Sequence, residues 1–281
     1  MAQDILLLCV DYKNDEETEA FVRAVFAADT ASRVFVSVAD NSEKSEADWI
    51  SFATKFCNFG ERIIVSACGG NLGYFGGLNF AYQKGLEKFK NQNFLCVVVS
   101  NTDIELIGQH FFDRLTEAVS DCEYSNVGVI APSIRSSITG ADQNPFYPYK
   151  PSRKKFTLLG KIYSVYTFAV AHRLLANVKK VIHNATHAES KLKRDIYGAH
   201  GSFMVFLKRY FGSGLGFNYP EFLFCEEMFV AEQCKQAGLR TVYLPEIEVI
   251  HREHSSTGLI PSREIVEYLR RSHEFCRDNY F

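Results

Sequence analysis

The sequence predicts an α/β fold with a Rossmann-like, mostly parallel sheet flanked by helices. Three observations support this class: apolar runs of strand length alternate with helical segments, several of these runs stop at polar residues, and a glycine-rich stretch opens a helix. Strands that alternate with helices favour parallel pairing. With 281 residues, 47% of them hydrophobic, the chain is long enough for one large α/β domain.

The first part of the chain is expected to alternate strand and helix. Apolar runs predict strands at 4–12, 33–39 and 62–66, and amphipathic spacing predicts helices at 16–28 and 49–56. The second predicted strand ends at three polar residues, Asp40, Asn41 and Ser42. This pattern places polar side chains at one edge of the sheet.

The run VVVSNTDIE, at 97–105, is the centre of the predicted sheet. Its β-branched residues read as a buried strand, which stops at Asn101 and Asp103. In an open α/β sheet, ligands bind in the crevice outside the carboxyl ends of the strands. Asp103 therefore stands where a metal or a phosphate-bearing substrate would be met, although an ordinary turn would use the same residue types.

A glycine-rich loop, NLGYFGGLN at 71–79, opens the next predicted helix. Glycines let the backbone approach a ligand closely, and a helix start offers free N–H groups to a phosphate. The glycine spacing matches neither GxGxxG nor a Walker loop. A Rossmann dehydrogenase and a P-loop NTPase therefore fit poorly.

The second half of the chain is expected to hold three more strands and three more helices, strands at 127–132, 197–207 and 241–250 and helices at 109–119, 226–237 and 263–280. Glu226 and Glu227 begin one of these helices, where the positive end of the helix dipole favours an ionised carboxylate. His251 directly follows the last predicted strand.

Positive charge is concentrated in one block, which the net charge of −2 conceals. Between Lys150 and Arg194 eleven Lys or Arg residues stand against one acid, Glu189. Inside the block, residues 156–181 contain an apolar run that is helical in length and has basic flanks. Such a segment suits an anionic membrane surface, and a solvated helical insertion is an equal alternative. Nucleic acid is not expected as a partner, because no known binding module surrounds the block.

The rest of the composition favours a cytoplasmic protein. Eight cysteines show no CxxC pair, so neither disulfides nor a zinc site is expected. The first apolar run is too short for a signal peptide, and no stretch approaches the roughly 20 apolar residues of a membrane span.

Five motifs occur in order along the chain: NLGYFGGLN, NTD, GAHGSF, FLFCEE and IHREHSST. Together they resemble the inverting glycosyltransferases of family 2, above all the bacterial rhamnosyl- and galactofuranosyl-type members that build surface polysaccharides. The resemblance implies a GT-A domain over 1–258, with the basic helical insertion at 150–195 inside it, and a C-terminal helix over 259–281. It also implies a UDP- or dTDP-linked hexose or deoxyhexose donor, a glycan or lipid-linked glycan acceptor, and Mn²⁺ or Mg²⁺.

The resemblance also assigns roles to individual residues. Donor binding falls to Asp11, Asp40, Asn41, Asn71, Gly73 and Asn101, and metal binding falls to Asp103 and His251. Glu227 is the expected catalytic base, and the adjacent Glu226 is the alternative. Two positions depart from the family pattern, since Asn101 and Glu227 each stand where an Asp is usual. The reaction itself requires a metal ligand and a base, independently of the resemblance. A divalent ion stabilises the charge on a departing nucleoside diphosphate, and a carboxylate can take the proton of the attacking hydroxyl.

Two other functions remain open from the sequence. A sugar-nucleotide nucleotidyltransferase has a similar layout, but it usually carries a basic, glycine-rich loop after the first strand, whereas residues 11–17 are acidic here. A non-catalytic domain that binds a glycan or a protein partner on the same fold would fit the departures at Asn101 and Glu227.

Overall fold

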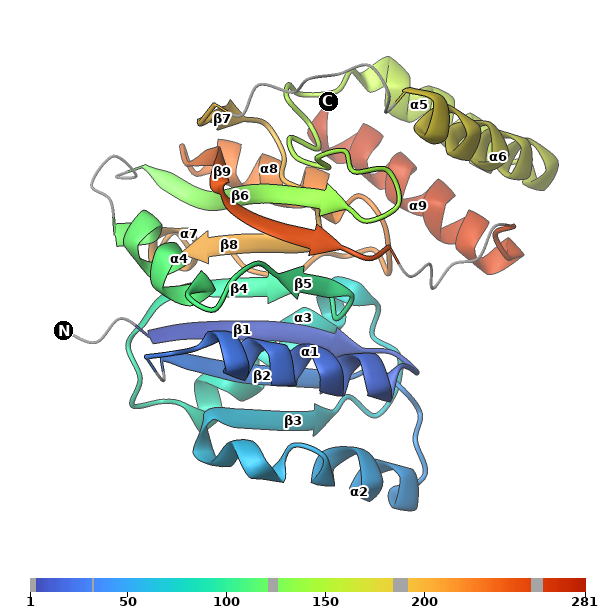
Figure 1. Ribbon diagram of the computed structural model, residues 1–281. Coiled ribbons are helices and arrows are strands. Elements are labelled where there is room, and N and C mark those ends of the chain that lie inside the picture. The colour runs from blue at the N-terminus through green and yellow to red at the C-terminus, as the bar shows by residue number, and fades with distance from the viewer. Residues whose placement is uncertain (1–3, 32, 121–125, 184–191, 254–259) are drawn as a thin grey trace.

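The computed structural model describes residues 4–31, 33–120, 126–183, 192–253 and 260–281 of the chain. Within these residues, nine strands form one sheet with helices on both faces (Figure 1). The strand order is β3-β2-β1-β4-β8-β6-β9-β5, and β7 pairs with β9 outside this path. The α/β class predicted from the sequence is confirmed.

The N-terminal half of the sheet is parallel. β1 (Asp4–Asp11) pairs in parallel with β2 (Val34–Asp40) on one side and with β4 (Phe94–Ser100) on the other. β3 (Ile63–Ala67) extends this half as the parallel partner of β2. The carboxyl ends of β1, β2 and β3 therefore lie at the same edge, as the alternation of strands and helices predicts.

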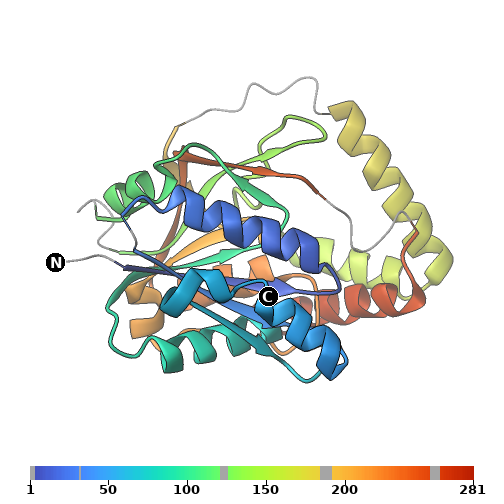
Figure 2. The ribbon, with the colours of Figure 1, turned by 60° about the horizontal axis from the view of Figure 1, so that its bottom comes forward.

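Helices cover both faces of this parallel half. α1 (Asp15–Ala28) and α2 (Glu46–Thr54) pack on one face, and α3 (Tyr74–Lys88) packs on the other (Figures 1 and 2). Successive residues of β1 alternate between the two layers: Leu7 joins the core under α1, and Leu6 joins the core under α3. A strand buried on both faces explains why β1 reads as an unbroken apolar run.

The C-terminal half of the sheet is mixed and consists of β5 (Ile104–Leu106), β6 (Val127–Ser136), β7 (Arg194–Ile196), β8 (Phe203–Leu207) and β9 (Arg240–His251). β8 runs antiparallel between β4 and β6, and β9 runs parallel to β6. β5 and β7 pair antiparallel with β9 near its two ends. The alternation of strands and helices did not predict these antiparallel strands.

The remaining helical elements are η1 (Cys57–Arg62), α4 (Phe111–Ser120), α5 (Arg153–Tyr163), α6 (Tyr166–His183), α7 (Lys208–Gly212), α8 (Glu226–Gln236) and α9 (Arg263–Tyr280). α5, α6 and α9 form a separate layer beside the sheet (Figure 1). A small apolar cluster, with side chains from all three helices, holds this layer together. Within the described part of the chain, no helix is both long enough and apolar enough to cross a membrane.

Two predicted elements differ in the structure. The helical run expected over 156–181 is broken at Ser164 and Val165 into α5 and α6, because the chain turns there so that both helices can pack on α9. The strand expected over 197–207 begins only at Phe203, because residues 197–202 form a turn that packs against neighbouring side chains. The division of the chain at residue 258 stays a prediction. Residues 184–191 of the basic insertion and 254–257 of the IHREHSST motif lie outside the described residues.

Candidate active site

Asp103 and His251 form a close pair at one edge of the sheet. Asp103 directly precedes β5, whose first residue, Ile104, lies opposite His251 in the antiparallel ladder with β9. The backbone N–H of Arg252 also donates to the carbonyl oxygen of Asp103 at 2.9 Å. Oδ2 of Asp103 lies 3.2 Å from Nε2 of His251. The structure thus brings together the two residues that the sequence assigned to one site.

Gln143 holds His251 from the other side. Nδ1 of His251 lies 2.7 Å from Oε1 of Gln143, and Nε2 of Gln143 donates to Oε1 of Glu253 at 3.0 Å. Because the carboxylate of Glu253 attracts the NH₂ end of the amide, the amide oxygen faces His251, and Nδ1 carries the proton. In a neutral imidazole this leaves the lone pair of Nε2 facing Asp103, which is what metal ligation requires.

Asp103 and His251 fit one side of a divalent-metal site. A carboxylate oxygen suits Mg²⁺ or Mn²⁺, and an imidazole nitrogen adds a ligand that transition metals accept. Among the residues that the structure describes, no group of three or more His, Cys, Asp or Glu side chains could hold an ion. Asp103 and His251 would therefore supply two ligands of an ion bound here, and its other ligands would come from outside this pair.

The acidic pair begins α8 after a constrained turn. Phe224 and Cys225 have φ values of 74° and 65°, a left-handed conformation that is uncommon for residues other than glycine. Glu226 reaches back and accepts a hydrogen bond from the N–H of Phe224 at 3.0 Å. Glu227 instead accepts from the N–H of Gly201 at 3.3 Å. The two neighbouring carboxylates therefore have different surroundings: Glu226 supports its own turn, and Glu227 faces a separate loop.

Burial changes the acidity of both glutamates. Loss of water, together with the nearby carboxylate of Glu227, raises the pKa of Glu226 to about 8. Burial also raises the pKa of Glu227. Glu226 is only 6% exposed, and Glu227 is the more exposed of the two. Glu226 therefore holds its proton more firmly than a solvated glutamate does, and burial disfavours ionisation of both carboxyls.

Tyr74, the first residue of α3, connects the acidic pair with Asp103. Its hydroxyl donates to the carbonyl oxygen of Gly201 at 3.1 Å. Burial raises the pKa of Tyr74 well above its usual value, and the charges of Glu226, Asp103 and Glu227 raise it further. All three carboxylates are thus close enough to disfavour ionisation of the Tyr74 phenol, which stays a neutral hydrogen-bond donor.

Gly73 fixes the position of the loop before α3. It has a φ of 75°, and a Cβ atom added there would lie 2.0 Å from the carbonyl oxygen of Phe222. Its carbonyl oxygen accepts from Nδ2 of Asn41 at 2.8 Å, and its N–H donates to Oδ1 of Asn71 at 3.0 Å. Only glycine fits this backbone and this close contact. The loop therefore touches both the end of β2 and the segment that leads to the acidic pair.

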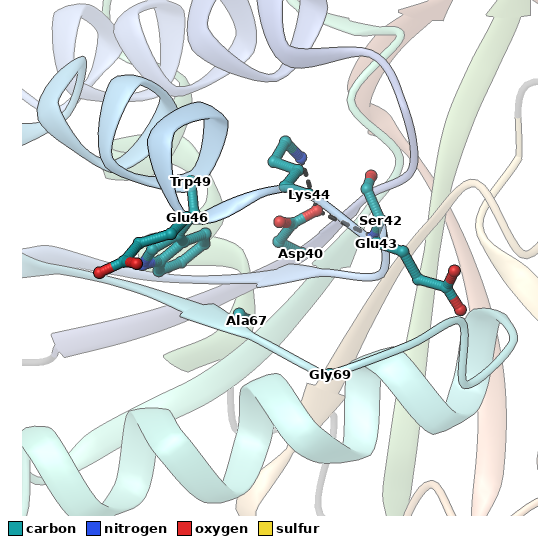
Figure 3. A pocket seen from close by; sticks show the side chains of 8 residues that line it. All are labelled: Asp40, Ser42, Glu43, Lys44, Glu46, Trp49, Ala67 and Gly69. Atoms are coloured by element: carbon teal, nitrogen blue, oxygen red, sulfur yellow. Dashed lines mark hydrogen bonds and ion pairs between the residues drawn. The ribbon is translucent and has the colours of Figure 1, made fainter.

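A pocket of about 400 Å³ opens at the carboxyl ends of β2 and β3 (Figure 3). Asp40, Lys44 and Trp49 are among the residues that line it. Nζ of Lys44 lies 2.7 Å from Oδ1 of Asp40 and 3.0 Å from Oδ2 of Asp11, so it neutralises part of this acidic region. Among the described residues, Oδ2 of Asp40 and Oδ1 of Asn41 are buried acceptors with no hydrogen-bond partner. A hydrogen-bond donor from a ligand or from water would satisfy these two oxygen atoms.

No family model matches the chain. It is similar to the N-acetylglucosaminyl-diphospho-decaprenol L-rhamnosyltransferases of two Mycobacterium tuberculosis strains, CDC 1551 / Oshkosh and ATCC 25618 / H37Rv, with 23% identity over 187 residues in each case. The match covers 66% of this chain and 55% of each of those proteins, so the chain spans about half the length of the curated relatives it matches.

Among solved structures, the chain is similar to the mannosyltransferase PcManGT from Pyrobaculum calidifontis in complex with GDP-Man and Mn²⁺. The TM-score is 0.51 at 11% sequence identity, and the match covers 94% of this chain and 59% of that one. The chain has a GT-A-like fold and resembles the glycosyltransferases of family 2. Within this fold, the parallel half of the sheet carries the pocket, and the mixed half carries His251 and the acidic pair.

The GT-A-like fold gathers five of the six residues that the sequence assigned to donor binding: Asp11, Asp40, Asn41, Asn71 and Gly73 are linked directly or through Lys44. The backbone N–H of Asn101 donates to the carbonyl oxygen of Ser202 at 2.8 Å, which places Asn101 beside the loop that faces Glu227. Its role toward a donor stays a prediction.

Sequence reasoning missed three residues of this region. Lys44 could have been inferred as a counter-ion, because it stands four positions after Asp40 in an otherwise acidic stretch. Tyr74 lay inside a recognised motif, but no pattern predicted that its hydroxyl would meet Gly201. Gln143 gave no signal, because it lies in a turn-rich passage far from His251 in the sequence.

Proposed function

We propose that this chain is an inverting glycosyltransferase that moves a hexose or deoxyhexose from a UDP- or dTDP-linked donor to a glycan or lipid-linked glycan acceptor. The observation that carries the proposal is a continuous path of contacts. It runs from Asn41, the neighbour of the pocket residue Asp40, through Gly73 and Tyr74, to Gly201 and Glu227. A transferase of this kind needs a nucleotide pocket and a base for the acceptor within one connected site, and this path links the residues proposed for these two roles.

The nucleotide base is proposed to bind at Asp40 and Asn41. Both side chains offer a buried oxygen acceptor. Uracil and thymine each present a ring N–H that can donate to such an oxygen, and this donor would remove the penalty of a buried acceptor left without a partner. Trp49, which lines the pocket together with Asp40, offers an apolar surface for the base.

Mn²⁺ or Mg²⁺ is proposed to bind between Asp103 and His251. Such an ion, when bound, stabilises negative charge on the departing nucleoside diphosphate. The chain's own contribution is to orient the ligands, since Gln143 holds the imidazole with Nε2 toward Asp103. The structure of PcManGT contains Mn²⁺ and GDP-Man, which supports a divalent ion without distinguishing Mn²⁺ from Mg²⁺.

Glu227 is proposed to take the proton of the attacking acceptor hydroxyl. The N–H of Gly201 donates to its carboxylate, and its side chain is more exposed than that of Glu226. A hydroxyl that attacks the anomeric carbon from the side opposite the diphosphate inverts the configuration at that carbon in a single displacement. Glu226, still protonated at neutral pH, adds no second negative charge beside the base.

The acceptor is proposed to be lipid-linked, and the protein to act in the cytoplasm at the inner face of a membrane during surface-polysaccharide synthesis. The mycobacterial relatives are named for N-acetylglucosaminyl-diphospho-decaprenol, a lipid-linked sugar, which supports this choice of acceptor class. The competing nucleotidyltransferase function is less favoured, since Lys44 is already engaged by three carboxylates. A pyrophosphate would find no available cation at Lys44.

Calorimetry with UDP, dTDP and GDP, each with and without Mn²⁺, tests the donor site. We expect UDP or dTDP to bind more tightly than GDP, and Mn²⁺ to increase that affinity. Asp40→Asn should weaken binding of the preferred nucleotide, whereas Asp48→Asn, an exposed change on the neighbouring helix, should not. Absence of nucleoside diphosphate binding under every condition would contradict the proposal.

A further inference from the structure

The α5–α6 surface, which we define as the exposed side of residues 153–176, carries large apolar side chains in contact with solvent. Leu158 is 59% exposed, and Phe168 and Leu175 are each 62% exposed. Val165, in the turn between the two helices, and Leu174, on α6, are 42% and 45% exposed. Residues this apolar and this exposed usually occur singly on a soluble protein, so their concentration on adjoining helices indicates a binding surface.

Helical spacing places these side chains along one face. Phe168, Ala171 and Leu175 are separated by three and four positions, which is the spacing of neighbours on one helix face. The opposite face of α6 is already used, because Ala169 is buried against α9. A helix that packs with one face normally presents polar residues on the other. The outer face of α6 therefore has the composition of a second contact face.

The charged residues within the α5–α6 segment itself have one sign. Residues 150–176 include six Lys or Arg and no Asp or Glu. Lys154 and Lys161 are exposed and stand four before and three after Leu158 on α5. Apolar side chains interleaved with lysine suit the boundary between acyl chains and anionic headgroups, where the apolar groups enter and the ammonium groups meet phosphate.

The surface stands at the outer side of the molecule and connects to the acidic pair. Figures 1 and 2 show α5 and α6 at the margin, with α9 between them and the sheet. α9 in turn holds the segment before Glu226: Oγ of Ser272 donates to the carbonyl oxygen of Leu223 at 2.5 Å, and the Tyr268 ring packs on the Phe222 ring with centroids 4.5 Å apart. The layer that carries the surface is thus also the support of the acidic pair.

We propose that the α5–α6 surface docks the protein on an anionic lipid bilayer, with Phe168 and Leu175 inserted among the lipids and Lys154 and Lys161 at the headgroups. This inference adds a membrane-binding surface to the proposed function. It rests on that function in one respect only, namely that docking would bring the protein to a lipid-linked acceptor. Binding to the bilayer itself follows from the exposed apolar side chains and from the Lys and Arg residues of the same segment. It requires neither a donor nor an acceptor.

Co-sedimentation with vesicles of phosphatidylcholine, with and without phosphatidylglycerol, tests the proposal. We expect the protein to bind the anionic vesicles, and added salt to weaken binding. Phe168→Ser with Leu175→Ser should lower vesicle partition at least about tenfold, since it removes the inserted groups. The matched control is Ile50→Ser with Ile138→Ser, which changes two side chains that are 57% and 66% exposed elsewhere. This control should bind like the unaltered protein.

The charged part of the surface is tested separately. Lys154→Glu with Lys161→Glu should reduce binding to anionic vesicles and leave the weak binding to phosphatidylcholine alone unchanged. Lys90→Glu with Lys235→Glu, both exposed on other elements, makes the same change in net charge as a control. Equal losses in the two lysine variants would overturn the role of this surface.

Two further outcomes would overturn the proposal. One is undiminished vesicle binding by Phe168→Ser with Leu175→Ser. The other is a dimer, seen by light scattering, that dissociates in this variant, because the face would then belong to a second copy. Failure of the proposed function has a different signature: the protein would bind vesicles as described but transfer no sugar. Transfer to a water-soluble acceptor should be the same in the variant and the unaltered protein.

Discussion

Nε2 of His251 lies 3.2 Å from Oδ2 of Asp103, while Nδ1 of the same ring lies 2.7 Å from Oε1 of Gln143. The amide oxygen requires the proton on Nδ1, so in the neutral ring the lone pair of Nε2 meets a carboxylate oxygen. Either a proton on Nε2 or a cation held by both side chains removes the repulsion between these two atoms. The pair can therefore form part of a divalent-metal site at this end of the sheet.

We predict that Asp103→Asn lowers the Mn²⁺-dependent affinity for a nucleoside diphosphate at least about tenfold, because a neutral amide oxygen replaces a charged ligand. The affinity measured without metal should change little. Calorimetry with and without Mn²⁺ separates the two effects. Asp278→Asn, which removes an exposed carboxylate near the end of α9, is the control. Equal Mn²⁺-dependent affinity in Asp103→Asn and the unaltered protein would contradict the assignment.

The two glutamates are predicted to differ in function. Glu227→Gln keeps the size and most hydrogen-bonding capacity of the side chain but removes its basicity. The rate of sugar transfer should therefore fall by about 10²- to 10⁴-fold with donor affinity nearly unchanged. Glu226→Gln should be milder, because Glu226 is already protonated at neutral pH and mainly accepts from the N–H of Phe224. If Glu226→Gln proves the inactive variant and Glu227→Gln retains turnover, the roles are reversed.

Stability should fall as pH rises through the raised pKa of Glu226, which is about 8. A carboxyl whose pKa is higher in the folded than in the unfolded protein binds more protons when folded. Its stabilising contribution is fully present below the ordinary pKa of 4.5 and is lost progressively up to about 8. Glu226→Gln, which does not ionise, should flatten this part of the pH profile of the unfolding free energy, measured by denaturant titration. Parallel profiles for both proteins would contradict the burial of an ionisable Glu226.

Gly73→Ala should be much more destabilising than the same change at Gly214. Both glycines have positive φ values, 75° and 76°, so the backbone strain is matched at roughly 1 to 2 kcal/mol. Only at Gly73 would the new methyl group collide with the carbonyl oxygen of Phe222, 2.0 Å away, whereas the space around Gly214 is open. Denaturant unfolding of both variants measures the difference. Similar losses in both would show that the loop before α3 does not pack as described.

Much of the fold could be predicted from the sequence because hydrophobic periodicity is a local signal. β1 is buried on both faces, so its apolar run marks it clearly. The position of β8 was not predictable in this way, because a short buried strand has no pattern that distinguishes antiparallel from parallel pairing. The turn at 197–202 was missed for a related reason: its small residues suit a strand or a turn, and contacts with distant residues decide between them.

The candidate site was predictable where its residues follow strands. Asp40 and Asp103 each stand at or just after the end of a strand, so the fold class alone brings them to one edge. The partners that define their chemistry come from other parts of the chain. Gln143 contacts His251 only because a loop after β6 returns to the end of β9. No local pattern contains that information.

Mass spectrometry of a reaction with UDP- and dTDP-linked hexoses, Mn²⁺ and a lipid-linked glycan acceptor would detect the proposed transfer itself. We expect an acceptor heavier by one sugar and an equal amount of free nucleoside diphosphate, with both products strongly reduced in Glu227→Gln. If no donor in the panel yields a glycosylated acceptor, or if donor is consumed equally by Glu227→Gln and the unaltered protein, the proposed site does not perform this transfer.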